Sequence, residues 1–310
     1  MSASVSSSVV EMPYRRLGRT GEMVSLVGLG GFHTGVQKEE EESIRLIRTA
    51  IDNGVSFLDN CWDYNDGVSE VRMGRALRDG YRRRAFLMTK IDGRTRQAAA
   101  SQIEECLRRL QTETIDLLQF HEVIRMDDAD RVFSPGGAME AVLAARQAGK
   151  VRYIGFTGHK SPEVHLRMLQ TASDHGFTFD AVQMPLNVMD AHFRSFQREV
   201  VPVLQQQDIG ILGMKSLGEG HVLRSGVVTA EECLRYAMDL PVHVTIVGCA
   251  TLEHLEAALS AARSLRPMTT QQRESLLART AGTGRTGEYE PYKTGTDFDP
   301  TSRNPSWLGL

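Results

Sequence analysis

The chain alternates short apolar segments with longer amphipathic ones, and this alternation restricts the fold more than any other feature. Eight apolar segments have the length of buried strands, and each is followed by a segment with helical spacing of apolar residues. In the third helical segment, Ile103, Cys106 and Leu110 recur on one face. The expected strands span residues 24–29, 55–58, 85–89, 115–120, 151–156, 181–183, 209–214 and 244–247. The expected helices span residues 39–53, 69–79, 95–110, 137–147, 162–175, 194–206, 229–238 and 251–263.

Eight strand–helix units predict an α/β fold of the (β/α)8 TIM-barrel type. An open doubly wound sheet is the alternative, but eight regular units favour closure of the sheet. Residues 14–18 and 23–25 flank a turn and predict an N-terminal β-hairpin that caps the barrel bottom. After Pro267 we expect a C-terminal helix over residues 271–281.

The last segment, residues 282–310, is rich in Gly, Thr, Pro and Asp but also carries four aromatic side chains. A purely disordered tail rarely contains so many aromatic residues. The expected organisation is therefore a disordered stretch over residues 1–13, the barrel over 14–266, and a helix with a tail over 267–310. We expect this tail to cover the mouth of the active site.

Composition narrows the choice of partner and compartment. The 310 residues carry a formal net charge of −3, which gives no reason to expect nucleic acid or an anionic membrane as partner. The Ser-rich stretch 2–8 lacks the pattern of a secretory signal, and no apolar run approaches membrane-spanning length. The four cysteines are scattered, without a CxxC pair. We expect a reduced, cytoplasmic protein without a structural zinc site, and the oligomeric state stays open.

Four polar residues lie at or just beyond the ends of consecutive expected strands: Asp59, Tyr64, Lys90 and His121. In a parallel barrel these strand ends converge on the face that carries the chemistry. A phenol with a pKa of ~10 can donate a proton to a developing alkoxide. The ammonium of Lys90 would lower the pKa of Tyr64, Asp59 would keep Lys90 charged, and His121 can hydrogen-bond a substrate oxygen. This set suits carbonyl reduction or alcohol oxidation, which also requires a hydride carrier because no side chain supplies hydride.

Two loops could hold the phosphates of such a carrier. Residues 213–218 follow the seventh expected strand, and residues 248–251 join the eighth strand to a helix N-terminus. Barrels commonly bind phosphate after these two strands, and Lys215 adds a positive charge. Ordinary strand-to-helix turns are an equally good interpretation of these loops. The glycine-rich run after the first strand fails the dinucleotide-binding fingerprint because His33 occupies its sixth position.

The stretch DNCWDYNDGVSEVRMGRAL, the strand end LMTK and the segment IDLLQFH together resemble the aldo-keto reductase family. The resemblance runs over residues 14–259 and matches the family's catalytic tetrad to Asp59, Tyr64, Lys90 and His121. It implies a (β/α)8 barrel, a nicotinamide dinucleotide, NADP(H) in preference to NAD(H), and no metal. The implied cofactor-binding residues are Gly31, Phe32, Asp59, Thr157, His159, Gln183, Met214, Lys215, Ser216, Leu217, Gly248, Ala250, Thr251 and His254.

The expected function is therefore an NAD(P)(H)-dependent alcohol dehydrogenase or carbonyl reductase. Its substrate is a small aldehyde, ketone, sugar or alcohol, and Tyr64 is the general acid and base. Two alternatives remain open from the residues. One is a Schiff-base lyase on the same barrel with Lys90 or Lys215 as nucleophile. The other is a non-catalytic subunit that retains the cofactor. Neither the substrate nor the reaction direction follows from the sequence.

Overall fold

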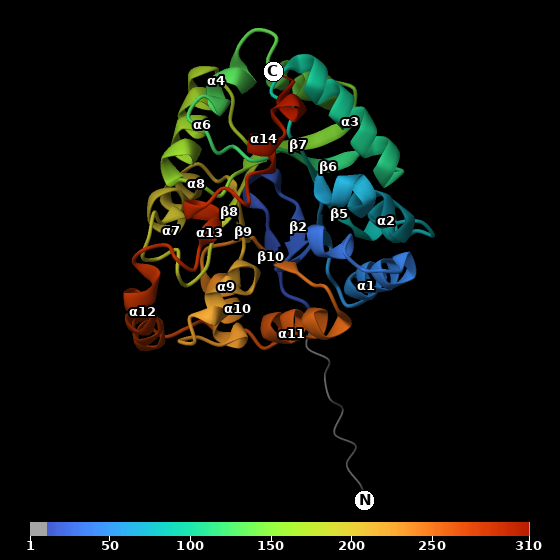
Figure 1. Ribbon diagram of the computed structural model, residues 1–310. Helices are drawn as coiled ribbons and strands as arrows, with labels where there is room; N and C mark the ends of the chain where they lie inside the picture. Colours follow the sequence, from blue (N-terminus) through green and yellow to red (C-terminus); the bar gives the residue numbers. More distant parts are fainter. Residues whose placement is uncertain (1–10, 310) are drawn as a thin grey trace, which may run out of the picture.

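Eight parallel strands close into a barrel in the computed structural model, which describes residues 11–309 (Figure 1). Around the barrel the strand order is β10-β3-β4-β5-β6-β7-β8-β9, so each strand pairs with its neighbour in sequence and β10 closes on β3. The strands are β3 (Val27–Gly30), β4 (Phe57–Asp59), β5 (Phe86–Ile91), β6 (Ile115–Phe120), β7 (Val151–Thr157), β8 (Ala181–Pro185), β9 (Gly210–Met214) and β10 (Val244–Gly248). The predicted (β/α)8 barrel is confirmed. The disorder expected for residues 1–13 lies almost wholly outside the described residues.

Helices cover the outside of the barrel between successive strands (Figure 1). They are α1 (Glu40–Asp52), α2 (Val68–Ala76), α3 (Arg96–Leu110), α4 (Asp128–Phe133), α5 (Ala138–Gln147), α6 (Pro162–Asp174), α7 (Phe196–Glu199), α8 (Val201–Gln206), α9 (His221–Arg224), α10 (Ala230–Asp239) and α11 (Leu252–Arg263). The single helix expected over 194–206 was wrong, because the chain breaks at Val200 into α7 and α8. Pro202 has no N–H to continue the first helix and stands in the first turn of the second.

The hairpin of β1 (Tyr14–Arg16) and β2 (Met23–Ser25) closes the amino-terminal end of the barrel. Leu17, in its loop, is fully buried among apolar side chains of the barrel interior. Gly18 adopts a φ of +46°, and a Cβ there would lie 2.6 Å from the backbone oxygen of Asp208, so this close approach needs glycine. The single strand expected over 24–29 is in fact two, since the chain passes at Leu26 from the hairpin into β3.

The barrel interior changes from apolar to polar along the strand direction. Phe57, Phe86, Met88 and Leu117 form part of an apolar layer near the amino-terminal ends of the strands. Side chains alternate along a strand, so the residue two positions further on points to the same side. Two positions after Phe57, Met88, Leu117 and Ala181 the side chains are polar and buried. They are Asp59 on β4, Lys90 on β5, Gln119 on β6 and Gln183 on β8. The fold thus gathers polar groups at the carboxyl ends of its strands.

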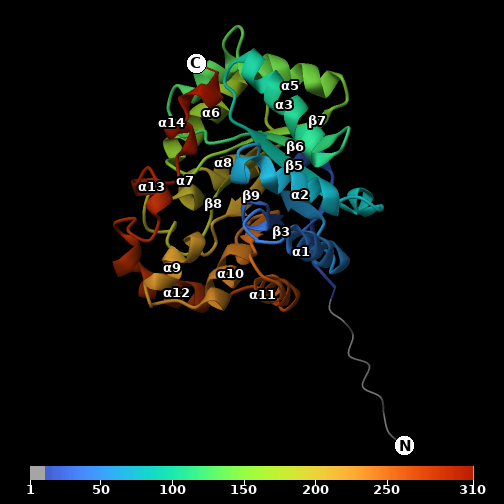
Figure 2. The same ribbon diagram turned by 45° about the vertical axis from the view of Figure 1, so that its right-hand side comes forward.

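The C-terminal segment runs across these carboxyl ends. It comprises α12 (Thr270–Gly284), α13 (Pro291–Thr294), α14 (Pro300–Arg303) and a final 3-10 turn (Pro305–Leu308), drawn in red in Figures 1 and 2. Its hydrogen-bond partners follow successive strands: Asn187 after β8, His159 after β7 and Glu122 after β6. The indole of Trp307 then meets that of Trp62, after β4, at 5.6 Å between ring centroids. We retain the division into residues 1–13, 14–266 and 267–310 as a proposal.

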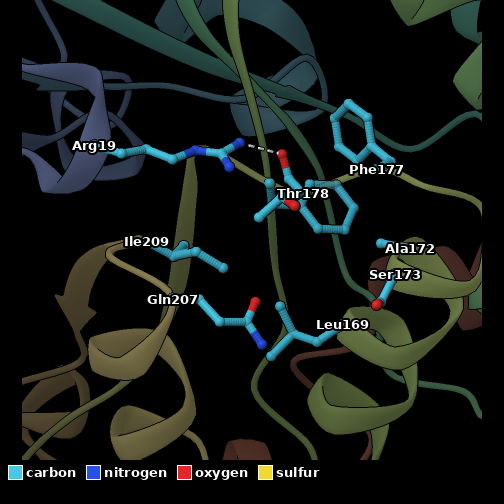
Figure 3. A pocket seen from close by; sticks show the side chains of 9 residues that line it. Arg19, Leu169, Ala172, Ser173, Phe177, Thr178, Gln207 and Ile209 are labelled. Atoms are coloured by element: carbon cyan, nitrogen blue, oxygen red, sulfur yellow. Dashed lines mark hydrogen bonds between the residues drawn. The ribbon is translucent and has the colours of Figure 1, made fainter.

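No helix among residues 11–309 combines the length and apolar character needed to cross a membrane. The cavity in Figure 3 lies at the opposite end of the barrel from the polar side chains. Its lining includes Thr178, just before β8, and Gln207 and Ile209, just before β9. Arg19 of the hairpin loop donates a hydrogen bond to the backbone oxygen of Thr178 there. This cavity is therefore separate from the candidate site.

Candidate active site

The four predicted catalytic side chains meet at the carboxyl ends of β4, β5 and β6. Lys90 Nζ lies 3.1 Å from the hydroxyl of Tyr64 and 2.8 Å from the backbone oxygen of Asn60. The same ammonium forms a buried ion pair with Asp59. The rings of Tyr64 and His121 meet edge to face with centroids 5.9 Å apart. The structure thus brings together all four residues that the sequence singled out.

Backbone pairing holds these side chains in place. The loop after β4 continues the parallel ladder with β5, since Asn60 N donates to Met88 O at 2.9 Å and Trp62 N donates to Lys90 O at 3.0 Å. Beyond this loop, Asn65 and Asp66 adopt positive φ values of 53° and 54°. This bend leads the chain from Tyr64 into α2.

Burial, rather than Lys90, dominates the electrostatics of Tyr64. Loss of solvent raises the pKa of the Tyr64 hydroxyl well above its usual value, and the charge of Asp59 acts in the same direction. The expected lowering by Lys90 is not found, because Asp59 neutralises the ammonium in a pair whose side chains are 1% and 4% exposed. Tyr64 therefore keeps its proton at neutral pH, as a proton donor requires.

His121 is held by a carboxyl group that the sequence argument missed. Its Nδ1 lies 2.9 Å from Asp92 Oδ1 and 3.6 Å from Asp63 Oδ1. Burial lowers the pKa of His121 to about 4 and raises the pKa of Asp92 to about 7. The imidazole is therefore neutral at physiological pH. Asp92 stands two positions after Lys90, so the alternation of β5 was the signal that could have placed it on the same face.

Cys61 completes a compact group with these residues. One possible ligand atom from each of Cys61, Asp63, Asp92 and His121 lies within 4.8 Å of all the others. Burial raises the pKa of the Cys61 thiol well above its usual value, and Asp63 and Asp92 add to this shift. That the site holds no metal stays a prediction.

Three expected cofactor-binding residues belong to β7, β8 and the loop after β7: Thr157 ends β7, His159 follows it, and Gln183 lies in β8. Gln183 donates from Nε2 to Asp59 Oδ2 at 2.8 Å, while its buried Oε1 has no partner within residues 11–309. Thr157 is buried, with its hydroxyl 4.0 Å from Met214 Sδ. His159 Nε2 lies 2.9 Å from Asp299 Oδ1 of the tail, and burial lowers the pKa of His159 to about 4. These side chains lie on the same end of the barrel as Tyr64.

The remaining expected cofactor residues lie at the carboxyl ends of β9 and β10, on the loops after β3, β9 and β10, and in the first turn of α11. The loops after β3 and β10 touch, since a Cβ on Gly248 would lie 2.3 Å from His33 Nδ1. Gln37 joins them by donating to His33 O and to Ala250 O. Gly31 is buried there and Phe32 is 46% exposed.

Lys215 differs from the expectation of a free cation beside phosphates. Its Nζ pairs with Glu219 at 2.6 Å and stands over the rings of Tyr292 and Phe298 of the tail. Its neighbour Ser216 is buried and Leu217 half-buried. At the start of α11, Thr251 uses its hydroxyl to accept from His254 N, and both side chains are exposed. These residues lie together at one end of the barrel, but the positive charge of Lys215 is already balanced by the carboxylate of Glu219.

Comparison with known proteins agrees with this geometry. A model of the "Aldo/keto reductase family" matches residues 26–227, which is well over half of the chain. The chain belongs to the aldo/keto reductase family. The match contains the four catalytic candidates and Gln183.

Individual relatives of this aldo/keto reductase are distant. Aldo-keto reductase AMT2 of Alternaria alternata is 29% identical over 253 residues, which cover 68% of this chain and 66% of the relative. Aldo-keto reductase YhdN of Bacillus subtilis is 29% identical over 239 residues, covering 71% of this chain and 66% of the relative. The chain thus spans just under two thirds of the length of these relatives.

Solved structures share the fold of this aldo/keto reductase. The holo form of aldo-keto reductase AKR11C1 from Bacillus halodurans matches with a TM-score of 0.72 and 22% identity. The match covers 87% of this chain and 96% of that one. The thermostable aldo-keto reductase Tm1743, in complex with the inhibitor epalrestat, has a TM-score of 0.70 and 22% identity, covering 86% of this chain and 100% of that one.

Proposed function

We propose that the protein is an NAD(P)(H)-dependent oxidoreductase that interconverts a carbonyl compound and an alcohol, with Tyr64 as general acid and base. One observation carries the proposal. The Tyr64 hydroxyl stands 3.1 Å from Lys90 Nζ, and Lys90 is paired with Asp59, at the carboxyl ends of the barrel strands. Membership of the aldo/keto reductase family and the barrel fold support an oxidoreductase.

The residues present fit a nicotinamide cofactor. Gln183 offers a buried Oε1 beside the tetrad that has no partner in the described part of the chain, and this oxygen is an acceptor for a carboxamide N–H group. Thr157 and His159 are further polar groups on the same rim. The loops after β3, β9 and β10 would hold the rest of the dinucleotide, and we propose NADP(H) in preference to NAD(H). When bound, the nicotinamide exchanges a hydride with the carbon atom of the substrate.

The chain's own side chains supply the proton and the orientation. Tyr64, whose pKa is raised by burial, keeps its proton and donates it to the substrate oxygen as negative charge develops there. Lys90 Nζ donates a hydrogen bond to the phenol oxygen at 3.1 Å and so holds this oxygen in place while the proton is transferred. His121 is neutral and can hydrogen-bond the substrate oxygen without adding charge. In the oxidative direction the same groups act in reverse.

The Schiff-base lyase is not favoured. A lysine nucleophile must be neutral, whereas Asp59 keeps Lys90 charged in a buried pair and Glu219 pairs with Lys215. Treatment with borohydride in the presence of aldehydes would trap a covalent adduct on either lysine if the lyase were the true function. A non-catalytic cofactor-binding subunit would bind the nicotinamide cofactor but would not turn over a generic aldehyde, so an activity assay distinguishes it from the proposed oxidoreductase.

The first test is a titration with NADPH and with NADH, in which the fluorescence of Trp62 and Trp307 reports cofactor binding. We expect saturable quenching by at least one cofactor, tighter with NADPH. A panel of aldehydes, ketones, sugars and alcohols then gives the substrate class and the preferred direction. If neither cofactor binds to folded protein, the proposed function is wrong. A cytoplasmic location and the absence of nucleic-acid or membrane partners stay predictions, and the oligomeric state stays open.

A further inference from the structure

The imidazole of His121 makes a single hydrogen bond among residues 11–309, and its partner is Asp92. His121 Nδ1 lies 2.9 Å from Asp92 Oδ1, whereas Asp63 Oδ1, at 3.6 Å, is beyond hydrogen-bond range. The other ring nitrogen, Nε2, is left for the substrate. In a neutral imidazole one nitrogen donates and the other accepts, so the proton between Nδ1 and Asp92 determines what Nε2 can do.

The backbone on both sides of this hydrogen bond is fixed. Arg94 Nη1 donates to Asp92 O at 2.8 Å, and Arg94 Nη2 donates to the backbone oxygens of His121 and Glu122. Gln102 Oε1 accepts from Asp92 N at 2.8 Å. One buried arginine therefore holds the backbone of both partners, and the contact between their side chains does not depend on a mobile loop.

The Asp92 carboxyl group has little besides His121 to bind. The residue is 0% exposed, and its Oδ2 has no hydrogen-bond partner in the described part of the chain. Lys90, whose charge acts on Asp92, is paired with Asp59. Arg94, which acts in the same way, is paired with Asp128 at 3.1 Å. Burial therefore raises the pKa of Asp92 to about 7, because a buried carboxylate without its own cation is costly.

The other titratable groups that face this pair bring no positive charge to it. Cys61 and Asp63, on the loop after β4, hydrogen-bond each other, and burial raises the pKa of both. Tyr64 packs edge to face against His121 and keeps its proton. Glu122, the next residue, accepts hydrogen bonds from the tail, and burial raises its pKa to about 8. The proton shared with Nδ1 therefore belongs to Asp92 and His121.

We propose that Asp92 is a positioning residue that fixes the tautomer of His121 and so decides whether Nε2 donates or accepts a hydrogen bond at the substrate oxygen. When Asp92 is protonated, its hydroxyl donates to Nδ1, and the neutral ring carries its own hydrogen on Nε2. When Asp92 is ionised, the carboxylate accepts from Nδ1–H, and Nε2 has only a lone pair. This inference rests on the proposed function, in which His121 faces the substrate oxygen.

The two forms differ in their use for carbonyl reduction. A carbonyl oxygen only accepts hydrogen bonds, so it needs the form of His121 with hydrogen on Nε2. That form requires protonated Asp92 and gives way to the other above a pH of about 7. Tyr64 does not titrate there, because burial holds its pKa well above the usual value. We therefore expect kcat/KM for reduction to fall by up to about tenfold per pH unit on the alkaline side.

The pH profile of Asp92→Asn tests this role. The full-length chain is assayed with NADPH and an aldehyde that the wild type reduces, from about pH 6 to about pH 9. The amide cannot ionise, so the alkaline fall of kcat/KM should disappear. A purely structural role would lower kcat/KM at every pH and keep the fall. Glu122→Gln and Asp63→Asn, the same change at two neighbouring buried acids, should keep the fall seen in the wild type.

Nuclear magnetic resonance detects the tautomer without any turnover. In chain whose histidines are labelled with ¹⁵N, a ring nitrogen that carries hydrogen is distinguished from one that does not by its chemical shift. The signals that are lost in His121→Gln belong to His121. In the wild type we expect hydrogen on Nε2 at about pH 6 and on Nδ1 at about pH 9. In Asp92→Asn the tautomer should be the same at both pH values.

The outcomes separate the role of Asp92 from the proposed function. A wild-type tautomer that does not change with pH overturns this role, and so does an alkaline fall that survives in Asp92→Asn. Loss of the fall in Asp63→Asn instead would assign the proton to Asp63 and also overturn it. If Asp92→Asn does not fold, the resonances of the wild type decide. A tautomer that changes as expected, in protein that binds neither nicotinamide cofactor, would reject only the proposed function.

Discussion

Tyr64 carries the only hydroxyl that hydrogen-bonds Lys90 among the described residues, and burial keeps that hydroxyl protonated. Replacing it with phenylalanine removes the proton donor and keeps the ring packed edge to face against Phe32 and His121. We expect Tyr64→Phe to lower kcat by about 10²–10⁴-fold. Titration with NADPH should show nearly unchanged binding. A variant with near-normal kcat would remove Tyr64 from the role of acid.

Because Asp59 and Lys90 form a buried ion pair, we expect mutation of one partner to lower the free energy of unfolding, an effect that can be measured separately from activity. Lys90→Met leaves the Asp59 carboxylate buried with Gln183 Nε2 as its remaining side-chain donor among residues 11–309. Breaking a buried ion pair on one side costs about 3–5 kcal/mol. We expect Lys90→Met to unfold at clearly lower urea concentration and to lack activity.

The double variant Asp59→Asn/Lys90→Met removes both charges, so it should regain much of the lost stability while staying inactive. Equilibrium unfolding in urea and steady-state kinetics measure the two effects. Equal destabilisation in the single and the double variant would show that packing, and not the uncompensated charge, sets the stability.

At the scale of elements, the tail is held to the barrel loops by more buried polar contacts than its sequence indicated. Residues 282–310 were expected to form a covering segment on the strength of four aromatic residues. The covering role stays a prediction, and the structure adds buried polar anchors to the tail: Lys293 is 1% exposed and donates hydrogen bonds to Asp190, Glu290 and Phe193 O. A buried lysine cannot be inferred from composition, because lysine in a Gly- and Thr-rich segment is normally solvated. Two of the three partners, Asp190 and Phe193, lie 103 and 100 residues earlier, beyond the reach of any local pattern.

Lys293→Met should therefore loosen the tail and destabilise the chain. The change leaves Asp190 and Glu290 buried without their cation, at a cost of about 3–5 kcal/mol. Lys150→Met is the matched control, since Lys150 pairs with Glu104 at the surface, with side chains 40% and 62% exposed. That pair should contribute only about 0–1 kcal/mol. Thermal unfolding and limited proteolysis of the tail measure the difference, and equal effects in both variants would contradict the anchoring role.

At the scale of the whole molecule, the barrel and its tetrad followed from the sequence because their signals are periodic and local. Strand alternation places Asp59, Lys90 and Gln183 inside the barrel, and strand ends place Tyr64 and His121 beside them. The break at Val200 has a local signal in Pro202, which the helical pattern over 194–206 overrode, whereas the split at Leu26 depends on how the hairpin packs against the barrel. Asp299, which meets His159, and Cys61 beside Asp92 were missed because only the closed barrel and its tail bring them together.

Besides His121, two buried histidines make the free energy of unfolding depend on pH. Burial lowers the pKa of both His159 and His165 to about 4, against an ordinary value of about 6.5. Between these values the unfolded chain binds more protons than the folded one, so stability rises with pH across this window and is lost as pH falls. Each histidine accounts for on the order of 3 kcal/mol when the shift is fully expressed.

Between pH 6.5 and pH 4 we expect His159 and His165 to lower the free energy of unfolding as pH falls, whereas the buried acids Asp92, Glu122 and Glu290, with pKa values raised to about 7, 8 and 7, act in the opposite direction. The contribution of His165 is therefore given by the difference in slope between a variant and the wild type. His165→Leu keeps an apolar group against Phe156 and Phe196. It should lower the slope of the free energy of unfolding against pH by an amount that corresponds to at most one bound proton. His175→Gln, at an exposed site, is the control and should keep the wild-type slope. Urea unfolding at half-unit pH intervals gives the three slopes. A His165→Leu slope equal to that of the wild type would mean that His165 is not buried in its neutral form.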